Sequence, residues 1–585
     1  MILESLRALA RREGLVDQPA FQSISVRWII DIDEQGQFQT LTDTAYTIPQ
    51  EGKRRSRQEF KRMSVPRRTV RPGQVTKPEF LVDNAQYVLG IQPEGADAKK
   101  IPMEAYRRSF LDLLLKAKAA VDASVLNATI AFLEDDEQRG RAAEELRALR
   151  FASNEWITFR LRSEFLHESV PVRNWWATQS EDTDGEFDRR QCLICGRVNV
   201  PARLHDSLKL PGAVSSGVPL VSFNERAFEK HGLSGNENAP ICRECMVAYV
   251  NALRRCLDDR YPRPDGSGSF PQQSMRLSDD TIAVYWDEQS SDLTGALWWL
   301  NNDDPSTVKA LLQSPQKGEK PAISQARFYC LVLTGAQGRA AVRGMHTSTV
   351  EQVAIKVKSY FKCIEAVGYE DKPAPIFVLI RSLAAQGKLD SLPPGLAAEV
   401  FLSAVLGEPL SHRFLAAAVC RIRAERDVTR PRAALLSLYF QRKGRSVPMS
   451  LDSDSKDAAY RYGRLLAVLE ALQINYHGRK PNSTIVDRFY GAASTRPATV
   501  FPRLLTLAQN HLKTAPYAEF FGKQITEVLN GLDGANGFRS TLNIEQQGRF
   551  ALGYFHQRAD RFKKSVSTDE IILASIESAT KETQA

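Results

Sequence analysis

Two cysteine pairs of identical spacing constrain the central part of this chain more than any other feature. The first pair is Cys192 and Cys195, the second is Cys242 and Cys245, and residues 196–241 lie between them. A C-x-x-C pair places two thiolates on one tight turn, and two such turns can close a tetrahedron around Zn²⁺. These pairs hold half of the chain's 8 cysteines. The spacing therefore predicts one zinc ion that staples the central region.

The cysteine spacing favours a structural metal over a catalytic one. Four thiolates fill the coordination sphere of zinc and leave no position for a reactive water. A zinc deaminase would combine His-x-Glu with Pro-Cys-x-x-Cys, whereas Ile241 here separates Pro240 from Cys242. His205 and His231 lie between the pairs and could replace a cysteine, although core or solvent-facing histidines are the simpler interpretation. Four unrelated buried cysteines are the alternative to a metal site.

A basic segment lies in the first quarter of the chain. Between Lys53 and Lys77 there are ten Lys or Arg residues and one acid, Glu59, an excess that equals the net charge of +9 for the whole chain. Lys and Arg displace counterions from phosphates, so a polyanionic partner is expected. A solvated loop is the usual explanation of a charge run, but this run is denser than solubility requires. The DNA-backbone contacts predicted in it are Arg54, Arg55, Arg57, Arg67 and Arg68.

The composition is that of a folded protein with several domains. The 585 residues exceed what one hydrophobic core holds, and 43% hydrophobic and 25% charged residues are ordinary values for a globular chain. No run of 18 apolar residues is present, which argues against a membrane span. Residues 1–13 lack the apolar run and cleavage site of a signal peptide. We therefore expect a cytoplasmic protein with reduced cysteines and no membrane partner.

Hydrophobic periodicity predicts a mixed amino-terminal half and a helical carboxy-terminal part. In the amino-terminal half we expect strands in 21–48, with a hairpin turn at Asp33–Gly36, and in 80–91 and 156–166, a helix in 101–150, and a loop that begins at Trp175-Trp176. Further along we expect a helix at 246–258, strands at 281–286, 327–334 and 339–345, and a helix at 348–367. From Pro375 onward the period is helical. Arg461 and Arg464 are predicted on the exposed face of one such helix, as further DNA-backbone contacts.

The predicted fold class is α+β and multi-domain. A mixed α/β amino-terminal domain with a zinc-stapled central region precedes an all-α carboxy-terminal helical bundle. The predicted boundaries are 1–170 for the amino-terminal domain, 171–270 for the zinc-knuckle region, 271–375 for an α+β unit, 376–448 for a helical segment and 449–585 for the bundle.

Catalytic signatures are missing from the sequence. It contains no phosphate-binding P-loop, no G-x-G-x-x-G, no H-E-x-x-H and no G-x-S-x-G, and its carboxylates form no cluster suited to a two-metal nuclease. A binding scaffold is therefore a simpler interpretation than an enzyme. Two alternatives stay open, a metal-dependent DNA nuclease and a stand-alone zinc-containing DNA-binding protein. The length and the lack of a helix-turn-helix pattern disfavour the second.

Several long stretches carry a family resemblance. They are ARLHDSLKLPGAVSSGVPLVSFNERAFEKHGLSGNENAPI between the cysteine pairs, MILESLRALARR at the amino terminus, PEFLVDNAQYVLG (78–90), FVLIRSLAAQGKLDSLPPGLAAEV (377–400), RIRAERDVTRPRAALL (421–436), FYGAASTRPATVFPRLL (489–505) and EQQGRFALGYFHQR (545–558). Together they resemble the large-subunit family of the type I-C CRISPR Cascade complex, the CRISPR-associated Csd large-subunit family. The resemblance covers nearly the whole chain.

The resemblance implies a non-catalytic subunit of a crRNA-guided surveillance complex in antiviral defence. Such subunits lie beside the crRNA 5′ handle, recognise the protospacer-adjacent motif (PAM) in double-stranded DNA, help to form the R-loop and recruit a separate helicase-nuclease. Guide pairing reads the target sequence, and the protein reads only the short flanking motif. The implied partners are crRNA, target DNA, the backbone subunits, the 5′-handle-binding subunit, small subunits and the recruited nuclease.

By the same resemblance, motif recognition falls on the loop from Arg71 to Lys77. The amide of Gln74 can donate and accept at base edges, and Arg71 and Lys77 can hold phosphates. Asn84 is a weaker candidate, because an Asn at this place can simply cap a turn.

The resemblance also concerns the origin of the small subunits. In this family the small subunit resembles the carboxy-terminal part and is made from an internal start within the same gene. Met449 is the only methionine after Met345, and it follows the breaker-rich segment Gly444–Pro448. We therefore expect an internal start at Met449, with a GUG or UUG codon nearby as the alternative.

Overall fold

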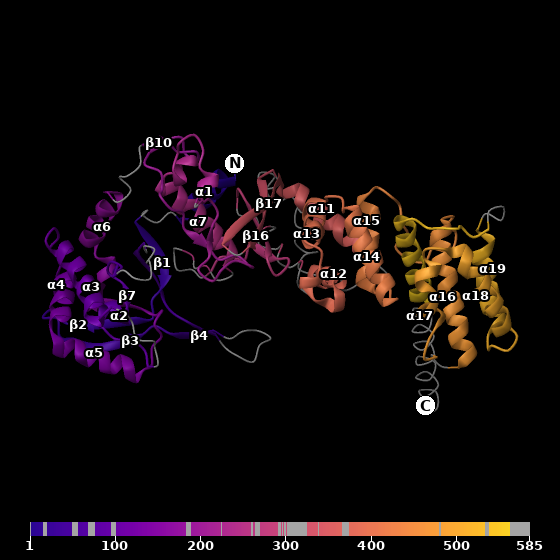
Figure 1. Cartoon of the computed structure of the whole chain (residues 1–585), viewed down its shortest axis with the longest axis horizontal. Helices are drawn as coiled ribbons and strands as arrows, with labels where there is room; N and C mark the ends of the chain where they lie inside the picture. Colours follow the sequence, from indigo (N-terminus) through magenta and orange to yellow (C-terminus); the bar gives the residue numbers. More distant parts are fainter. Residues whose placement is uncertain are drawn as a thin grey trace, which may run out of the picture. The chain divides into compact units, whose positions relative to one another are not determined.

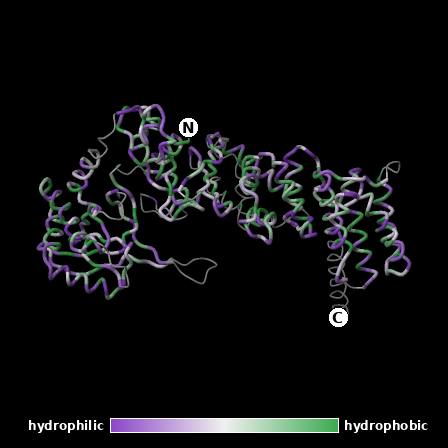
Figure 2. Tube along the Cα trace, in the orientation of Figure 1, coloured by the Kyte–Doolittle hydropathy of each residue, from purple (hydrophilic) through white to green (hydrophobic). Residues whose placement is uncertain are grey.

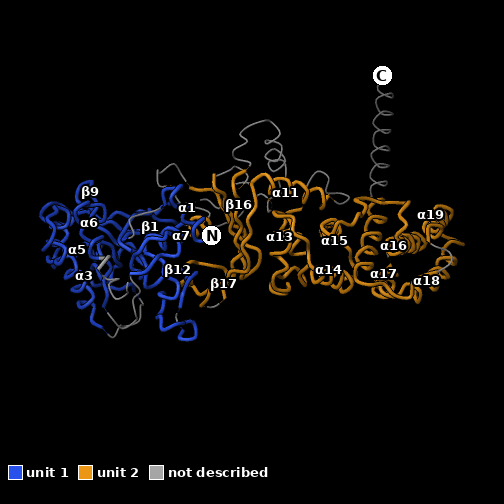
Figure 3. The backbone as a smooth tube through the Cα atoms, turned by 90° about the horizontal axis from the view of Figure 1, so that it is seen from above, with its two compact units in different colours: residues 1–207, 219–252 blue, residues 208–218, 253–585 orange. Residues whose placement is uncertain are grey.

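The computed structural model describes residues 2–15, 20–48, 57–67, 76–94, 101–182, 189–223, 225–258, 261, 263, 269–289, 294, 297, 300, 325–336, 338–365, 374–478, 481–532 and 537–561. The chain forms two compact units (Figure 3): unit 1 comprises residues 1–207 and 219–252, and unit 2 comprises residues 208–218 and 253–585. The five predicted domains divide the chain more finely than these units and stay a prediction. Within the described ranges, no helix has both the length and the apolar character that crossing a membrane needs.

Unit 1 is built on a five-stranded sheet with the order β3-β2-β8-β7, in which β9 also pairs with β8 (Figure 1). The strands are β2 (Trp28–Ile32), β3 (Phe38–Asp43), β7 (Asp83–Asn84), β8 (Trp156–Leu161) and β9 (Glu164–Phe165). β2 runs antiparallel to β3 and parallel to β8. The predicted hairpin turn is confirmed: the Gly36 N–H donates to the Asp33 carbonyl at 3.0 Å, and Gly36 adopts φ +79°.

Helices pack on this sheet and close its core. They are α2 (Ala85–Val88), α3 (Met103–Lys118), α4 (Ser124–Glu134), α5 (Asp136–Ala148) and α6 (Val170–Asp182), whereas α1 (Ile2–Arg12) contributes no residue to this core. α4 contacts β2 and β8, and α5 contacts β3. The core holds Trp28, Ile30 and Phe159 from the strands and Phe110 and Phe132 from the helices, all buried. Large apolar side chains that alternate along β2 and β8 thus meet the apolar stripes of the helices.

Shorter elements complete unit 1. The strand pairs are β1 (Phe21–Ser25) with β6 (Arg62–Pro66), β4 (Tyr46–Ile48) with β5 (Arg57–Glu59), and β10 (Arg190–Gln191) with β11 (Val198–Asn199). Single turns of 3₁₀ helix lie at Leu166–Glu168, Arg226–Phe228 and Gly235–Asn238. The two-residue strands β12 (Ser207–Leu208) and β13 (Val218–Pro219) border the segment 208–218, and α7 (Arg243–Leu257) follows the second cysteine pair.

Two expectations for unit 1 are wrong. The strand expected over 80–91 is only β7 followed by α2, because the Asp83 carboxylate accepts the N–H groups of Glu79 and Asn84, both at 2.7 Å, in a tight local turn. The loop expected from Trp175 is the helix α6, and it is stabilised by packing. The rings of Trp175 and Trp176 lie 5.3 and 4.6 Å from that of Phe80.

Unit 2 begins with an antiparallel four-stranded sheet in the order β14-β15-β16-β17. Its strands are β14 (Ser274–Arg276), β15 (Thr281–Asp287), β16 (Arg327–Ala336) and β17 (Arg339–Thr349), and α11 (Val350–Ile364) follows. The strands and helix expected here are confirmed, and β14 was not expected. The Thr349 hydroxyl caps α11 by accepting the Gln352 N–H at 3.2 Å, which explains why the helix starts directly after the strand.

The rest of unit 2 is helical, as expected. The helices are α12 (Ile376–Ser382), α13 (Leu396–Leu406), α14 (His412–Glu425), α15 (Arg430–Arg442), α16 (Ala458–His477), α17 (Ile485–Ala493), α18 (Pro497–Leu512), α19 (Ala518–Asn530) and a last helix over 544–561, with 3₁₀ turns at Ala385–Gly387 and Leu389–Ser391. Figure 2 shows hydrophilic and hydrophobic stretches alternating along these helices, as amphipathic packing requires.

One continuous hydrophobic core runs through unit 2, from Met275 in β14 to Phe555 in the last helix. α16 packs against α17, α18 and α19. It also crosses the last helix at backbone contact: a Cβ added to Gly463 would lie 1.9 Å from the Phe550 carbonyl oxygen, and one added to Gly553 would lie 2.0 Å from that of Tyr460. Only glycine fits these two positions.

Candidate functional site

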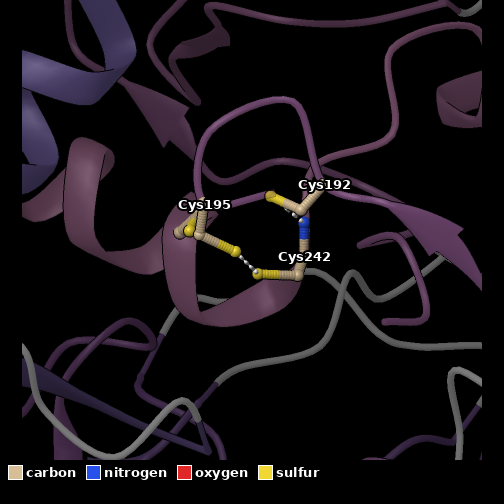
Figure 4. A group of neighbouring side chains, drawn as sticks. Cys192, Cys195 and Cys242 are labelled. Carbon is tan, nitrogen blue, oxygen red and sulfur yellow. Dashed lines mark hydrogen bonds between the residues drawn. The ribbon is translucent and has the colours of Figure 1, made fainter. Parts of the chain in front are cut away.

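The structure brings the four predicted cysteine ligands together, and Figure 4 shows three of them. All four Sγ atoms lie within 4.8 Å of one another. The Sγ atoms of Cys195 and Cys242 are 3.8 Å apart. Zinc–sulfur bonds of about 2.3 Å give a tetrahedron with edges of about 3.8 Å. Three of the thiols are buried and Cys195 is half-buried, so the geometry is that of an enclosed four-thiolate site.

The first pair lies at the turn of the hairpin formed by β10 and β11. The N–H of Gly196 donates to the Cys192 carbonyl at 2.9 Å, and the N–H of Cys192 donates to the Arg197 carbonyl at the same distance. Gly196 has φ +71°, which favours glycine after the second cysteine. The N–H of Ile194 points at the Cys192 Sγ at 3.4 Å, as a backbone donor does when it stabilises a thiolate.

The second pair lies at the start of α7. Cys242 directly precedes the helix and Cys245 is in its first turn, where the partial positive charge of the amino-terminal end favours thiolates. The two pairs are also joined by backbone contacts. The N–H of Cys242 donates to the Cys192 Sγ at 3.3 Å, and the N–H of Leu193 donates to the Pro240 carbonyl at 2.9 Å.

The negative charge of the four thiolates favours a bound cation at the cluster. A hydrogen bond from the Cys245 thiol lowers the pKa of Cys242 to about 5. The same bond, together with burial and the charge of Cys242, raises the pKa of Cys245, and burial raises that of Cys192. Four thiolates at this spacing therefore repel one another unless a bound metal ion compensates their charge. The donor set fits a structural metal that prefers sulfur.

A group of charged side chains surrounds the cluster, and sequence reasoning missed it. Glu244 accepts hydrogen bonds from Arg197 and, at 2.9 Å, from Arg11 in α1. Burial raises the pKa of Glu244, but these two bonds outweigh it and hold the pKa below its usual value. Asn251 also donates to the Leu15 carbonyl at 3.0 Å. The amino-terminal helix is thus tied to the cysteine-bearing helix. The signal in the sequence was an acid inside the second pair and an arginine just after the first.

Most of the predicted DNA-contact residues lie outside the described residues. These are Arg54, Arg55, Arg68, Arg71 and Gln74, together with the side chain of Arg57, whose backbone is in β5. Lys77 is described: it is exposed, and its N–H donates to the Tyr87 hydroxyl at 3.2 Å. Asn84 occupies the N-cap of α2 without a capping bond from its side chain. Its Oδ1 is buried and has no partner among the described residues.

Arg67 does not lie on an exposed face, as a backbone contact would. It is 7% exposed, forms an ion pair with Asp206 and donates to the Phe21 carbonyl at 3.0 Å. Arg67 directly follows β6, and its guanidinium points into unit 1 rather than into solvent.

The prediction that Arg461 and Arg464 lie on an exposed helix face is also wrong. Both are buried in the carboxy-terminal bundle, at 5% and 2% exposed. Arg461 donates to the carbonyls of Glu527 and Val528, and Arg464 donates to those of Asp452 and Ser453, at 3.0–3.2 Å. In the described structure both guanidinium groups satisfy buried carbonyls, and a DNA contact at these residues stays an untested prediction.

Comparison with protein families supplies the identity of the chain. The family model described as CRISPR-associated protein (Cas_Csd1) matches residues 4–562, nearly the whole chain. No curated protein matches. The match includes the amino-terminal helix, both cysteine pairs and the carboxy-terminal bundle, and it confirms the family resemblance of the sequence. The chain belongs to the Cas_Csd1 family of CRISPR-associated proteins.

Proposed function

We propose that this protein is the non-catalytic large subunit of a crRNA-guided type I-C Cascade surveillance complex in the cytoplasm. It recognises the PAM in double-stranded DNA, helps to form the R-loop and recruits the helicase-nuclease in antiviral defence. The observation that carries this proposal is the family match over residues 4–562. The guide pairs with the target strand, and the protein reads the short flanking motif.

The segment beside the basic loop supports the proposed motif recognition. The Lys77 backbone is tied to Tyr87, and Asp83 fixes the turn at Glu79 through a 2.7 Å bond. Phe80 is buried and stacks on Trp176. Residues 76–90 therefore hold one end of the basic segment in place. In our proposal Gln74 reads base edges, because its amide can both donate to and accept from a base, while Arg71 and Lys77, which can only donate, hold phosphates.

We further propose that the ion in the cysteine cluster is Zn²⁺ and that it is structural. Four thiolates at tetrahedral spacing suit zinc, and with all positions filled the ion stabilises the fold without taking part in a reaction. This is also why we favour a binding subunit over a metal-dependent nuclease. The proposed partners are crRNA, target DNA, the other Cascade subunits and the recruited helicase-nuclease, with small subunits started at Met449.

Affinity purification of the tagged protein from its native cells, followed by sequencing of bound RNA, tests the proposal. We expect repeat-derived guides of uniform length and co-purifying Cascade subunits. The purified complex should bind a duplex that carries the correct flanking motif more tightly than a duplex that carries a wrong one. A lone protein without RNA that cleaves DNA would contradict the proposal and favour a nuclease. A lone protein that binds DNA without a guide would favour a stand-alone DNA-binding protein.

A further inference from the structure

A cavity of about 580 Å³ lies in unit 1, in the segment that joins the two cysteine pairs. Its lining residues come from 203–205, 219–223 and 229–236. Small-molecule sites usually have volumes of about 300–1,000 Å³, so the cavity is large enough for a ligand. Neither the cysteine cluster nor the basic segment accounts for it.

The floor of the cavity is fixed to the cysteine cluster. The Asn236 Nδ2 donates to the Ala202 carbonyl at 3.1 Å, and the N–H of Ala202 donates to the Ile241 carbonyl, next to Cys242, at 2.8 Å. Within the same segment the Glu229 carboxylate accepts the N–H of Gly235 at 2.9 Å. These bonds fix the lining segment 229–236 internally and tie it to the residues beside the second cysteine pair.

Two buried polar side chains line the cavity, and one of them has a buried ring nitrogen without a partner among the described residues. His205 is 7% exposed; its Nδ1 is 2.7 Å from the Tyr249 hydroxyl, and its Nε2 has no partner within the described part of the chain. Burial lowers the pKa of His205 to about 4, so the ring is neutral and Nε2 carries the proton when Nδ1 accepts from Tyr249. Asn236 is 3% exposed and uses Nδ2 for Ala202, which leaves Oδ1 as an acceptor. Unused buried polar atoms are costly unless a ligand pairs with them.

Other lining residues supply an apolar surface and a positive charge. Pro219, Val221 and Phe223 form an apolar wall, and the exposed Arg203 lies at the rim. An aromatic wall, a donor with an acceptor at the base and a cation at the mouth match the parts of a nucleotide. A base stacks on the ring and pairs along its edge, and its phosphate meets the arginine.

We propose that this cavity binds a single unpaired nucleotide, with its base against Phe223 and its edge at His205 and Asn236. This inference rests on the proposed function, because it assumes that the protein binds nucleic acid. It adds a binding site separate from the basic segment. A base with a neighbouring donor and acceptor on one edge, as in adenine, can accept from His205 Nε2 and donate to Asn236 Oδ1. The nucleotide can come from the guide RNA or from a DNA strand, and the experiment separates these sources.

Photocrosslinking with the complete purified protein tests the site. The probes are two single-stranded oligonucleotides of the same sequence, one RNA and one DNA, each with one 8-azidoadenine. Mass spectrometry should map the crosslink to 203–205 or 219–223. A crosslink by RNA alone assigns the site to the guide, and a crosslink by DNA alone assigns it to the target. Crosslinks only elsewhere, or none, overturn the proposal.

Matched variants sharpen the test. Phe223→Ala should weaken binding of the better probe roughly tenfold, the loss expected for one stacked base, and Phe223→Tyr should restore it. Arg226→Ala changes an exposed arginine of the same segment that does not line the cavity, and it should leave probe binding unchanged. Unaltered metal content and thermal unfolding show that each variant is folded.

Duplex DNA with the flanking motif serves as a second ligand. If Phe223→Ala binds the single-stranded probe normally, the cavity proposal fails while the proposed function stands. If the wild-type protein binds neither the probes nor the duplex, both fail.

Discussion

Unit 1 and the carboxy-terminal bundle of unit 2 both hold irregular segments in place, but they do so with different chemistry. In unit 1 the segment between the cysteine pairs is closed by four thiols within 4.8 Å of one another. In the bundle the segment before α16 is closed by Arg461 and Arg464, which donate to its carbonyls. A backbone without helix or strand needs such partners, because buried carbonyl and N–H groups are rarely left unpaired.

This difference decides what the cations of each region can do. The arginines of α16 are consumed inside the bundle, where each removes several carbonyls from water, whereas the exposed Lys77 of unit 1 has its charge in solvent. A guanidinium group that binds carbonyls inside the fold is not available to phosphate, whereas an exposed ammonium group is. A count of positive charges therefore says little about which of them meet phosphate.

Removal of the metal should have the largest effect of any change to the chain. Structural zinc contributes an apparent binding free energy of roughly 10–16 kcal/mol in small zinc domains, which is comparable to the whole stability of a domain, about 5–15 kcal/mol. We expect Cys192→Ser combined with Cys242→Ser to abolish zinc binding, from about one ion per chain. Hydrogen exchange should rise over 190–245 and in α1, which contacts Glu244, and stay unchanged in the bundle.

Cys420→Ser is the matched control, because Cys420 is exposed and lies outside the cluster. It should keep the metal and the hydrogen exchange of the wild type. Elemental analysis checks the metal. Little zinc in the wild type, or unchanged zinc in the double variant, would contradict a four-thiolate zinc site, and rapid exchange throughout unit 2 would show that the two regions are not held independently.

Arg464→Lys should have the second largest effect, and on stability rather than on DNA binding. Lysine keeps the charge but cannot reach Gln557, Glu527 and the Asp452 carbonyl together, as the guanidinium does at 2.7–3.2 Å. Losing hydrogen bonds made by this buried charged group costs about 3 kcal/mol, which urea denaturation of the protein should report. Arg503→Lys, on the exposed face of α18, should cost less than about 0.5 kcal/mol. A variant that unfolds normally but binds DNA poorly would show that Arg464 is a phosphate contact after all.

The parts of the molecule that sequence predicted well are those with strong local signals. The cysteine spacing alone brought Cys192, Cys195, Cys242 and Cys245 to one site, because chelation needs only four thiols on two turns. Hydrophobic periodicity predicted β15, β16 and the helices after residue 375. These features depend on a few neighbouring residues, and the chain between them has little influence.

The predictions that failed depend on contacts between distant segments. Arg464 has a polar side chain on a helix, and nothing local shows that its guanidinium meets Glu527 and Gln557. Arg67 meets Asp206 in the same way. The helix at Trp175 forms because Phe80 offers an aromatic surface to it. In each case the partner is far along the chain, so the burial of the residue cannot be read from its neighbours.

A smaller effect is expected for the loop from Arg71 to Lys77. Substitutions in this loop should change DNA binding rather than stability. Gln74→Ala should reduce discrimination against a wrong flanking motif by about 1–3 kcal/mol, the value of a good base contact. Lys77→Ala should weaken binding to all duplexes alike and reduce the slope of affinity against salt by about one. Binding titrations at several salt concentrations separate the two. If Gln74→Ala leaves motif preference intact, the loop only clamps phosphates.

A small effect on stability is expected at Met449, where the predicted bundle begins. Its Sδ accepts from Gln441 at 2.9 Å and from Ser437 at 3.4 Å, both in α15. Leucine has a similar volume, so Met449→Leu should cost less than about 1.5 kcal/mol. The variant nonetheless removes the proposed internal start. Intact masses from the untagged wild-type gene should include a product of about 15 kDa that begins at Met449, a comfortable size for one domain.

A start at Met449 also changes the surroundings of the last helix, because α15 lies before this residue. In the full chain the last helix packs on α15, where a Cβ on Gly548 would lie 3.1 Å from the Phe440 ring and Arg549 lies 5.5 Å from its centre. A product that starts at Met449 lacks α15 and exposes this face, which suits a subunit that docks on a neighbour.

Met449→Leu should abolish the short product and keep the long one, and Met345→Leu should keep both products. A complex with the full-length chain only, or a short product with another first residue, would contradict a start at Met449. Because the bundle is held by its own arginines rather than by the metal, the short product should fold without zinc.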